Sequence, residues 1–250
     1  MKCIILAAGY ATRLYPLTEN FPKPLLKVGE KTILDWLIDD IDRSGKVGEY
    51  IVVTNHKFAP IFEEWAPGHR TPIRILDDGT SSNETRLGAV RDIQFALDEC
   101  SLGKGEEDIL VIAGDNLLDF SLVSFIDYAI SKGTTSVMRF REDRPQVLSR
   151  SGVAQVDGND RIILMEEKPS VPKGNWCIPP FYFYRKEDVH LVSEGIEQGC
   201  GVDAPGSFIS WLSATVPVHA FLMPGRRYDI GNLESYHKAQ EEYPALMKEA

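Results

Sequence analysis

Apolar residues recur in the first half of the chain as short runs that alternate with stretches of helical spacing. The runs of β-forming residues predict strands near 2–7, 49–54, 72–76 and 108–113. Apolar residues three to four positions apart predict helices near 32–44, 58–65 and 86–98. Thr32 stands where its side chain can cap the first of these helices. Alternation of strands and helices indicates an α/β fold, with a mostly parallel sheet that carries helices on both faces.

The pattern changes after about residue 133. Strand patterns near 135–140, 152–156, 161–166 and 181–185 follow one another with few helices between them. Helical spacing returns near 186–197 and 206–213, before a strand near 217–222 and a terminal helix from about 233. No Pro-rich or Gly-rich linker separates the two halves. We therefore expect one domain over 1–250, with halves of about 1–132 and 133–250.

Composition narrows the class of protein. An apolar fraction of 43% and a charged fraction of 26% are typical of a globular protein, and no apolar run is long enough for a membrane span. Met1-Lys2 enters the first strand directly, so we expect no signal peptide and a cytoplasmic location. The net charge of −10 disfavours nucleic acid as a partner.

The four cysteines are widely separated in the sequence and form no C-x-x-C pair. We interpret them as reduced thiols and expect neither a disulfide framework nor a zinc site. They are Cys3, Cys100, Cys177 and Cys200.

The segment after the first strand carries the most specific chemical pattern. Ala7-Ala8-Gly9-Tyr10-Ala11-Thr12-Arg13 follows Leu6, and Pro22-Lys23-Pro24 comes shortly afterwards. Small residues let backbone N–H groups approach phosphate oxygens, and Arg13 and Lys23 add the positive charge that a polyphosphate needs. The spacing fits neither the dinucleotide motif nor the P-loop.

This segment closely resembles the signature loop of the sugar-1-phosphate nucleotidyltransferases, the nucleotide-sugar pyrophosphorylases. The family pattern is L-A-A-G-x-G-T-R-L-x-P-L-T followed by P-K-P, and Ala11 replaces its usual Gly. The resemblance implies a Rossmann-like, GT-A-like nucleotidyltransferase fold, with Arg13 and Lys23 as catalytic cations. It also implies that the nucleotide binds at Leu6, Ala7, Ala8, Gly9 and Thr12.

Two aspartates are candidate metal ligands. Asp115 directly follows a buried strand, where an Asp taken alone is more often a turn or cap residue. The resemblance implies that it binds Mg²⁺, because the family has a metal-binding Asp in a G-D-x segment there. Asp229 lies in Arg227-Tyr228-Asp229-Ile230-Gly231-Asn232, which resembles the family's W-x-D-[IV]-G-T and implies the second ligand, although Tyr228 and Asn232 depart from the pattern. We expect Asp119 to cap the next helix.

Glu166-Glu167-Lys168-Pro169 resembles the family's E-K-P motif, although such a string alone is usually a solvated charge pair. The resemblance implies that Lys168 binds the phosphate of a sugar 1-phosphate and that Glu167 binds sugar hydroxyls. Gly152 precedes this motif as a Gly does in relatives, and the resemblance implies that its backbone approaches the sugar. Asn116 and Trp176 complete the expected acceptor site, and an aromatic ring suits the apolar face of a sugar.

The residues that would recognise the base are less clearly marked. Gly88, in Leu87-Gly88-Ala89-Val90, resembles the Gly of the family's L-G-T-A segment, which admits the base or ribose. Thymidylyl-specific relatives carry a Gln shortly before it, and this chain has none. Glu84 and Thr85 are candidates for contacting a base edge instead, and Asn55 ends the second strand, where relatives line the nucleotide pocket.

The resemblance implies an enzyme that transfers a nucleoside monophosphate from a nucleoside triphosphate to a sugar 1-phosphate, with Mg²⁺, and releases pyrophosphate. A cytidylyltransferase for phosphocholine or another non-sugar phosphate remains an alternative, supported by Trp176, Tyr182 and the acidic balance. A non-catalytic regulatory homologue that binds a nucleotide sugar is a second alternative. Such a homologue should have lost some of the charged motif residues, whereas this chain retains all five: Arg13, Lys23, Asp115, Lys168 and Asp229. A homo-oligomer is possible.

Overall fold

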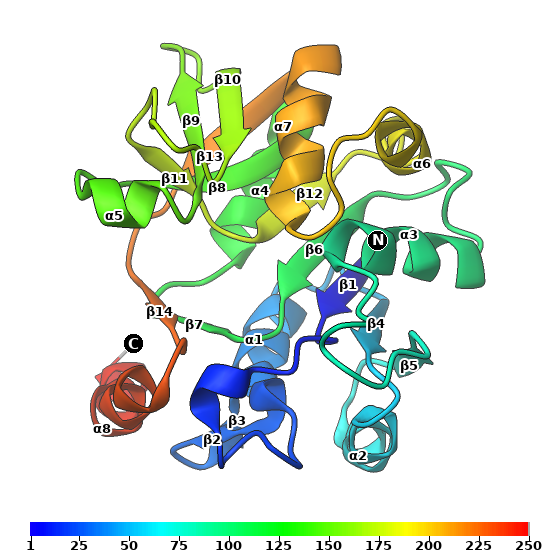
Figure 1. Ribbon diagram of the computed structural model, residues 1–250, viewed down its shortest axis with the longest axis vertical. Helices are drawn as coiled ribbons and strands as arrows, with labels where there is room; N and C mark the ends of the chain where they lie inside the picture. Colours follow the sequence, from blue (N-terminus) through cyan, green and yellow to red (C-terminus); the bar gives the residue numbers. More distant parts are fainter. Residues whose placement is uncertain (250) are drawn as a thin grey trace. The chain divides into compact units, whose positions relative to one another are not determined.

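The computed structural model describes the backbone of residues 1–249 and the side chains of residues 1–243 and 245. Two compact units form, and each is assembled from three segments of the chain. Unit 1 comprises Met1–Ile4, Leu87–Ile112 and Phe125–Met223. Unit 2 comprises Ile5–Arg86, Ala113–Ser124 and the chain from Pro224 onward. Figure 1 labels the helices and strands of both units.

The sheet of unit 1 has the strand order β10-β9-β11-β8-β12-β6, with β13 beside β8. Neighbouring strands are antiparallel except for β13 and β8, which are parallel. The bounds are β6 (Ile109–Ala113), β8 (Thr135–Arg141), β9 (Gly152–Val156), β10 (Ile162–Glu167), β11 (Trp176–Ile178), β12 (Phe181–Tyr184) and β13 (Val218–Leu222).

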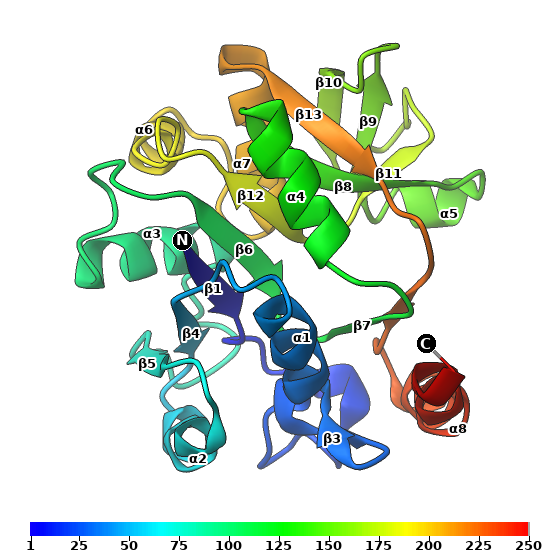
Figure 2. The ribbon, with the colours of Figure 1, turned by 180° about the vertical axis from the view of Figure 1, so that it is seen from behind.

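Helices cover both faces of this sheet. Figures 1 and 2 show α4 (Val123–Lys132) on one face and α7 (Pro205–Thr215) on the other. Each helix buries apolar side chains, such as Phe125 on α4 and Phe208 on α7. The remaining helices of the unit are α3 (Ala89–Glu99), α5 (Pro145–Leu148) and α6 (Leu191–Glu197). The α/β class predicted from the sequence is confirmed, with a mixed sheet.

Unit 2 receives the end of β1 (Lys2–Leu6) and contains a parallel pair of strands, β4 (Glu49–Thr54) and β5 (Ile73–Asp77). Its helices are α1 (Ile33–Asp42), α2 (Ala59–Trp65) and α8 (Leu233–Glu249). Two short antiparallel ladders complete it: β2 (Lys27–Val28) with β3 (Lys31–Thr32), and β7 (Asn116–Leu118) with β14 (Arg227–Asp229). Short 3₁₀ turns lie at Thr12–Leu14, Lys23–Leu25 and Ala66–Gly68.

Thr32 caps α1, as the sequence predicts, and the cap is part of a capping box with Asp35. The Thr32 hydroxyl accepts the backbone N–H of Asp35 at 3.0 Å, and the Asp35 carboxylate accepts the N–H of Thr32 at 2.9 Å. Two donors at the helix start, which have no partner inside the helix, are thereby satisfied. Behind the cap, Ile33, Leu34 and Leu37 are buried at helical spacing.

The expectation for Asp119 is wrong. Its Oδ1 accepts the backbone N–H of Arg226 at 2.6 Å, and its own N–H donates to the Arg226 carbonyl at 3.2 Å. The approach of β14 to β7 gives this carboxylate a partner distant in sequence, so it does not cap α4. Among the described residues, no helix has both the length and the apolar character of a membrane span.

Candidate active site

The signature loop leaves β1 at Leu6 in unit 2. The N–H of Ala7 donates to the Val53 carbonyl at 2.9 Å, and the N–H of Gly114 donates to the Leu6 carbonyl at 3.1 Å. These bonds place the start of the loop between Val53, on β4, and Gly114. A Cβ on Gly114 would lie 3.0 Å from the Ile5 side chain, so glycine suits this close approach.

Buried polar side chains fix the loop from behind. The Asn55 amide donates to the Ala8 carbonyl at 3.0 Å, and its oxygen accepts the N–H of Phe58 at 3.1 Å. The Thr18 hydroxyl donates to the Ala11 carbonyl at 2.8 Å. Asn55 is fully buried, so its geometry supports a positioning role behind the loop.

A cleft of about 130 Å³ opens in front of this loop. It brings together sequence-predicted residues from the loop and the P-K-P segment with Asp115. They are joined by Gly231, two residues after Asp229. The Arg13 guanidinium lies near Gly231, since a Cβ there would be 3.9 Å from both of its terminal nitrogens. The lining residues are Ala7, Gly9, Ala11, Arg13, Leu14, Lys23, Pro24, Asp115 and Gly231.

An ionic network joins the two candidate metal ligands. Lys23 Nζ lies 2.6 Å from Asp115 Oδ2, and the Asn116 amide donates to Asp115 Oδ1 at 2.8 Å. Arg227 Nη1 donates to Asn116 Oδ1 at 2.6 Å. Arg227 Nη2 lies 3.7 Å from Asp229 Oδ2. The network therefore runs from Lys23 to Asp229 without a break in the chain of polar contacts.

The β7–β14 ladder makes this network possible. Asp229 is the register partner of Asn116, the residue that follows Asp115. Sequence reasoning missed both the ladder and Arg227. The sequence did contain a signal for Arg227, because this charged residue replaces the Trp of the family pattern W-x-D.

The residues at this ladder fit a magnesium ion. Asp115 and Asp229 offer carboxylate oxygens and Asn116 an amide oxygen, and Mg²⁺ typically takes one or two protein carboxylates together with water and phosphate. In the described part of the chain, no group of three or more His, Cys, Asp or Glu residues forms a metal site by itself. A metal at Asp115 and Asp229 would therefore depend on oxygens from water or phosphate.

The predicted base residues of unit 2 lie in the loop after β5. Glu84 and Thr85 are exposed, and the Thr85 hydroxyl bonds within the same loop, to the N–H and carbonyl of Ser82. The Tyr10 hydroxyl ties the signature loop to this segment by donating to the Thr80 carbonyl at 3.1 Å. The loop therefore has a fixed base and an exposed outer turn.

Gly88 begins α3 in unit 1, and its surroundings explain the glycine. Its φ is +96°, and a Cβ would lie 2.5 Å from the Val202 carbonyl oxygen. The first N–H groups of α3 donate to this segment, from Ala89 to the Asp203 carbonyl and from Val90 to the Val202 carbonyl. Packing against residues 202–203 requires glycine here, whatever binds nearby.

Gly152 and Glu167 face each other across β9 and β10. They are register partners, and a Cβ on Gly152 would lie 2.9 Å from Glu167 Oε2. The same carboxylate lies close to Gly206 in the first turn of α7. Burial raises the pKa of Glu167 despite the favourable charge of Lys168. Two glycines thus make room for one partly desolvated carboxylate.

Lys168 follows β10 in a left-handed conformation, with φ +48°. Its N–H donates to the Ser151 carbonyl at 3.0 Å, and its half-exposed ammonium lies 3.9 Å from Asp203. Such backbone strain often accompanies a binding role. Trp176 shares a sheet face with this region, but the Arg139 guanidinium already lies 4.5 Å from the centre of its ring.

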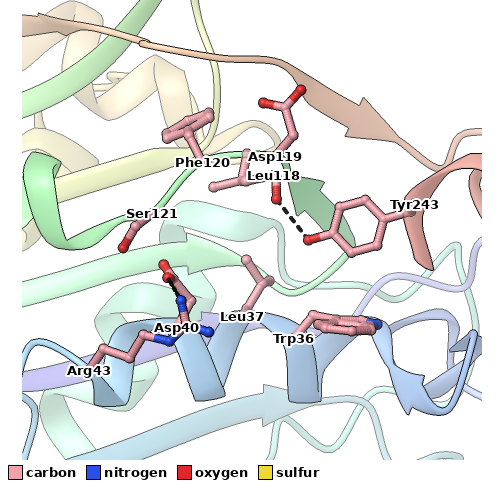
Figure 3. A pocket seen from close by; sticks show the side chains of 9 residues that line it. All are labelled: Trp36, Leu37, Asp40, Arg43, Leu118, Asp119, Phe120, Ser121 and Tyr243. Carbon is pink, nitrogen blue, oxygen red and sulfur yellow. Dashed lines mark hydrogen bonds and ion pairs between the residues drawn. The ribbon is translucent and has the colours of Figure 1, made fainter. Parts of the chain in front are cut away.

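A second cavity in unit 2, of about 180 Å³, contains none of the predicted site residues (Figure 3). Two of its polar groups hold the walls together. The Tyr243 hydroxyl donates to the Leu118 carbonyl at 2.7 Å, and Asp40 accepts the N–H of Leu122 at 2.7 Å. These bonds attach α8 and α1 to the β7 segment, which gives the residues a structural role.

Comparison with known proteins places the chain in a family. The family model described as nucleotidyl transferase matches residues 2–245. The chain belongs to the nucleotidyl transferase family. Its match to a solved UDP-glucose pyrophosphorylase, complexed with UDP-glucose, has a TM-score of 0.80 at 18% identity and covers 98% of both chains. At that identity the match establishes the fold alone.

Two curated relatives are longer than this chain. The chain is 24% identical over 245 residues to a UTP–glucose-1-phosphate uridylyltransferase from Synechocystis sp., covering 96% of this chain and 62% of the relative. It is 26% identical over 254 residues to a glucose-1-phosphate adenylyltransferase from Fervidobacterium nodosum, covering 96% and 60%. The chain therefore spans about three-fifths of the length of these relatives, which are named for different nucleotides.

Proposed function

We propose that this nucleotidyl transferase family member transfers a nucleoside monophosphate from a nucleoside triphosphate to a sugar 1-phosphate and releases pyrophosphate. The observation that carries the proposal is the cleft where the signature loop, Lys23 and Asp115 meet beside the segment of Asp229. Family membership and the names of the curated relatives support the same reaction.

The acceptor phosphate is already a nucleophile at neutral pH, so the reaction needs no general base. Its oxygen attacks the α-phosphorus, and the bond from that phosphorus to the bridging oxygen of pyrophosphate breaks. Orientation of the two phosphates and neutralisation of their charge therefore provide most of the rate.

In unit 2, the proposal assigns the triphosphate to the backbone N–H groups of the signature loop and to two cations. Arg13 would bind the β- and γ-phosphates and the departing pyrophosphate. Lys23 would bind the α-phosphate as negative charge develops there. Asp115 and Asp229 would hold Mg²⁺, which would neutralise charge on the phosphate oxygens.

In unit 1, the proposal assigns the acceptor to Lys168 and Glu167. Lys168 would bind the acceptor phosphate as a point charge. Glu167 would accept hydrogen bonds from sugar hydroxyls, and Gly152 leaves the space beside it. Trp176 is a weaker candidate for a choline cage, because Arg139 already lies against its ring.

A grid of substrates tests the proposal directly. Pyrophosphate release is measured for dTTP, UTP, CTP, GTP and ATP, each with several hexose 1-phosphates and with phosphocholine, in Mg²⁺ or EDTA. We expect one EDTA-sensitive pair to dominate and Asp115→Asn to lower its rate at least about a hundredfold. Asp39→Asn, an exposed aspartate paired with Lys31, is the matched control. Activity with CTP and phosphocholine alone would show that the acceptor is phosphocholine and not a sugar 1-phosphate. No pyrophosphate release from folded protein with any pair would refute the proposal.

A further inference from the structure

Both candidate metal-binding carboxylates in unit 2 already face a cation of the protein. Lys23 lies 2.6 Å from Asp115, and Arg227 lies 3.7 Å from Asp229. Asn116 connects the two pairs by donating to Asp115 and accepting from Arg227. The formal charges of Lys23, Asp115, Arg227 and Asp229 sum to zero, so this network has no excess of negative charge.

Lys23 is held where it contacts Asp115. It begins a 3₁₀ turn with proline on either side, and only 8% of its side chain is exposed. A short, charge-assisted contact of this kind is stronger than a neutral hydrogen bond. A second cation at Asp115 must therefore displace the ammonium or tolerate its repulsion.

Arg13 differs from Lys23 although both line the same cleft. Arg13 is exposed and, among the described residues, no carboxylate forms an ion pair with it. It is therefore available to an incoming phosphate. The cleft is thus lined by one cation that is open to an anionic ligand, Arg13, and by one that is paired with a carboxylate, Lys23.

We propose that Lys23 and Arg227 act as placeholders for a divalent cation, keeping free metal ions off Asp115 and Asp229 until a polyphosphate arrives. The proposal rests on the proposed function, in which these aspartates hold Mg²⁺. A polyphosphate would attract Lys23 toward its own oxygens and expose Asp115. The metal would then bind together with the polyphosphate, because only the polyphosphate both frees a carboxylate and supplies further oxygens.

Water-proton relaxation with Mn²⁺ tests the proposal on the full chain, without catalysis. The wild-type protein should give little enhancement with Mn²⁺ alone and a clear enhancement with Mn²⁺ and tripolyphosphate together. Lys23→Met should bind Mn²⁺ alone at least about tenfold more tightly, because a neighbouring positive charge is removed. Arg227→Met should act in the same direction. Adding Asp115→Asn to Lys23→Met should abolish the gain.

Two controls separate displacement from a general change of charge. Arg13→Met removes a cation from the same cleft that touches neither aspartate, and should change Mn²⁺ affinity by less than about threefold. Lys31→Met removes the partner of exposed Asp39 and should leave Mn²⁺ affinity unchanged. Circular dichroism confirms that each variant is folded.

Equal Mn²⁺ affinity in the wild type and in folded Lys23→Met and Arg227→Met would overturn the proposal. Equal tightening by Arg13→Met would overturn it as well. The pyrophosphate grid is independent of this measurement. If the grid shows activity but the two variants bind Mn²⁺ no more tightly than the wild type, the placeholder role is rejected. If the variants bind Mn²⁺ more tightly but the grid shows no activity, the proposed reaction is rejected, whereas competition between Lys23 and the metal for Asp115 is not.

Discussion

Ala11, in the signature loop, has a left-handed backbone conformation. Ala11 has φ +47° and ψ +41°, at the position where the family pattern has glycine. The left-handed region costs a residue with a Cβ roughly 1–2 kcal/mol. The usual glycine of the motif is therefore a backbone requirement, and this chain meets it with alanine under strain.

Replacing Ala11 with glycine should relieve this strain. We expect the free energy of unfolding of Ala11→Gly to stay the same or rise by up to about 1 kcal/mol, since the relief is partly offset by the entropy of glycine in the unfolded chain. Urea unfolding measures the change. Ala66→Gly, at φ −58°, should instead lose about 0.5–1 kcal/mol. Equal losses in both variants would contradict the strain.

Glu142 provides a pH-dependent contribution to stability in unit 1. Its carboxylate accepts hydrogen bonds from the Arg144 guanidinium and from the N–H groups of Asp143 and Arg144. These donors, with the Arg144 side chain first, lower the pKa of Glu142 from 4.5 to about 2. Because the folded-state pKa is depressed, the stability is fully present above pH 4.5 and is lost as pH falls toward 2.

Glu142→Gln should therefore lower the melting temperature at pH 7, and the difference from wild type should shrink between pH 4.5 and pH 3. Thermal melts across this range measure it. Glu106→Gln, an exposed glutamate without these donors, should show no such convergence. A difference that stays constant down to pH 3 would show that the charge of Glu142 is not the cause.

At the scale of elements, most long periodic segments were predicted with their bounds, and very short ones were not. The bounds of the ten-residue helix α4 were not predicted. The predicted strands near 49–54 and 108–113 and the helix near 32–44 correspond closely to β4, β6 and α1. The three-residue strands β7 and β14 are too short to show a period of two. Yet this ladder aligns Asp229 with Asn116. The sequence thus predicted Asp115 and Asp229 as metal ligands, whereas the pairing of Asp229 with Asn116 came from the tertiary structure.

The cap of α1 provides a test at this scale. Thr32→Ala removes the acceptor for the Asp35 N–H and leaves a helix-start donor without its partner. We expect the free energy of unfolding to fall by about 1 kcal/mol, measured by urea denaturation. Thr32→Ser retains the hydroxyl oxygen and should recover most of the loss. A serine variant as unstable as the alanine variant would indicate that the threonine methyl group, not the cap, provides the stability.

For the whole molecule, the proposed function assigns the two substrates to residues of different units. Arg13 in unit 2 should matter for the triphosphate, and Lys168 in unit 1 for the acceptor phosphate. Charge-assisted contacts contribute about 1.5–3 kcal/mol each, which is roughly a ten- to hundredfold effect on kcat/KM.

Steady-state kinetics can separate these two roles. Lys168→Met should raise KM for the sugar 1-phosphate more than KM for the triphosphate, and Arg13→Met should do the reverse. Lys173→Met removes an exposed lysine that is paired with Glu166 and should change neither constant. If Lys168→Met impaired only triphosphate binding, its proposed assignment to the acceptor would be wrong.

The sequence by itself determined the α/β class, the cap of α1 and the family, because these depend on local spacing and on contiguous motifs. Tertiary structure decided which charges meet. Arg227 and Lys23 are 204 positions apart, yet both belong to the network around Asp115 and Asn116. The tertiary structure also explains why residue 88 is glycine, because a Cβ there would collide with the Val202 carbonyl oxygen. Ion pairs and close approaches depend on distances in space, and these distances are set only when remote segments pack together.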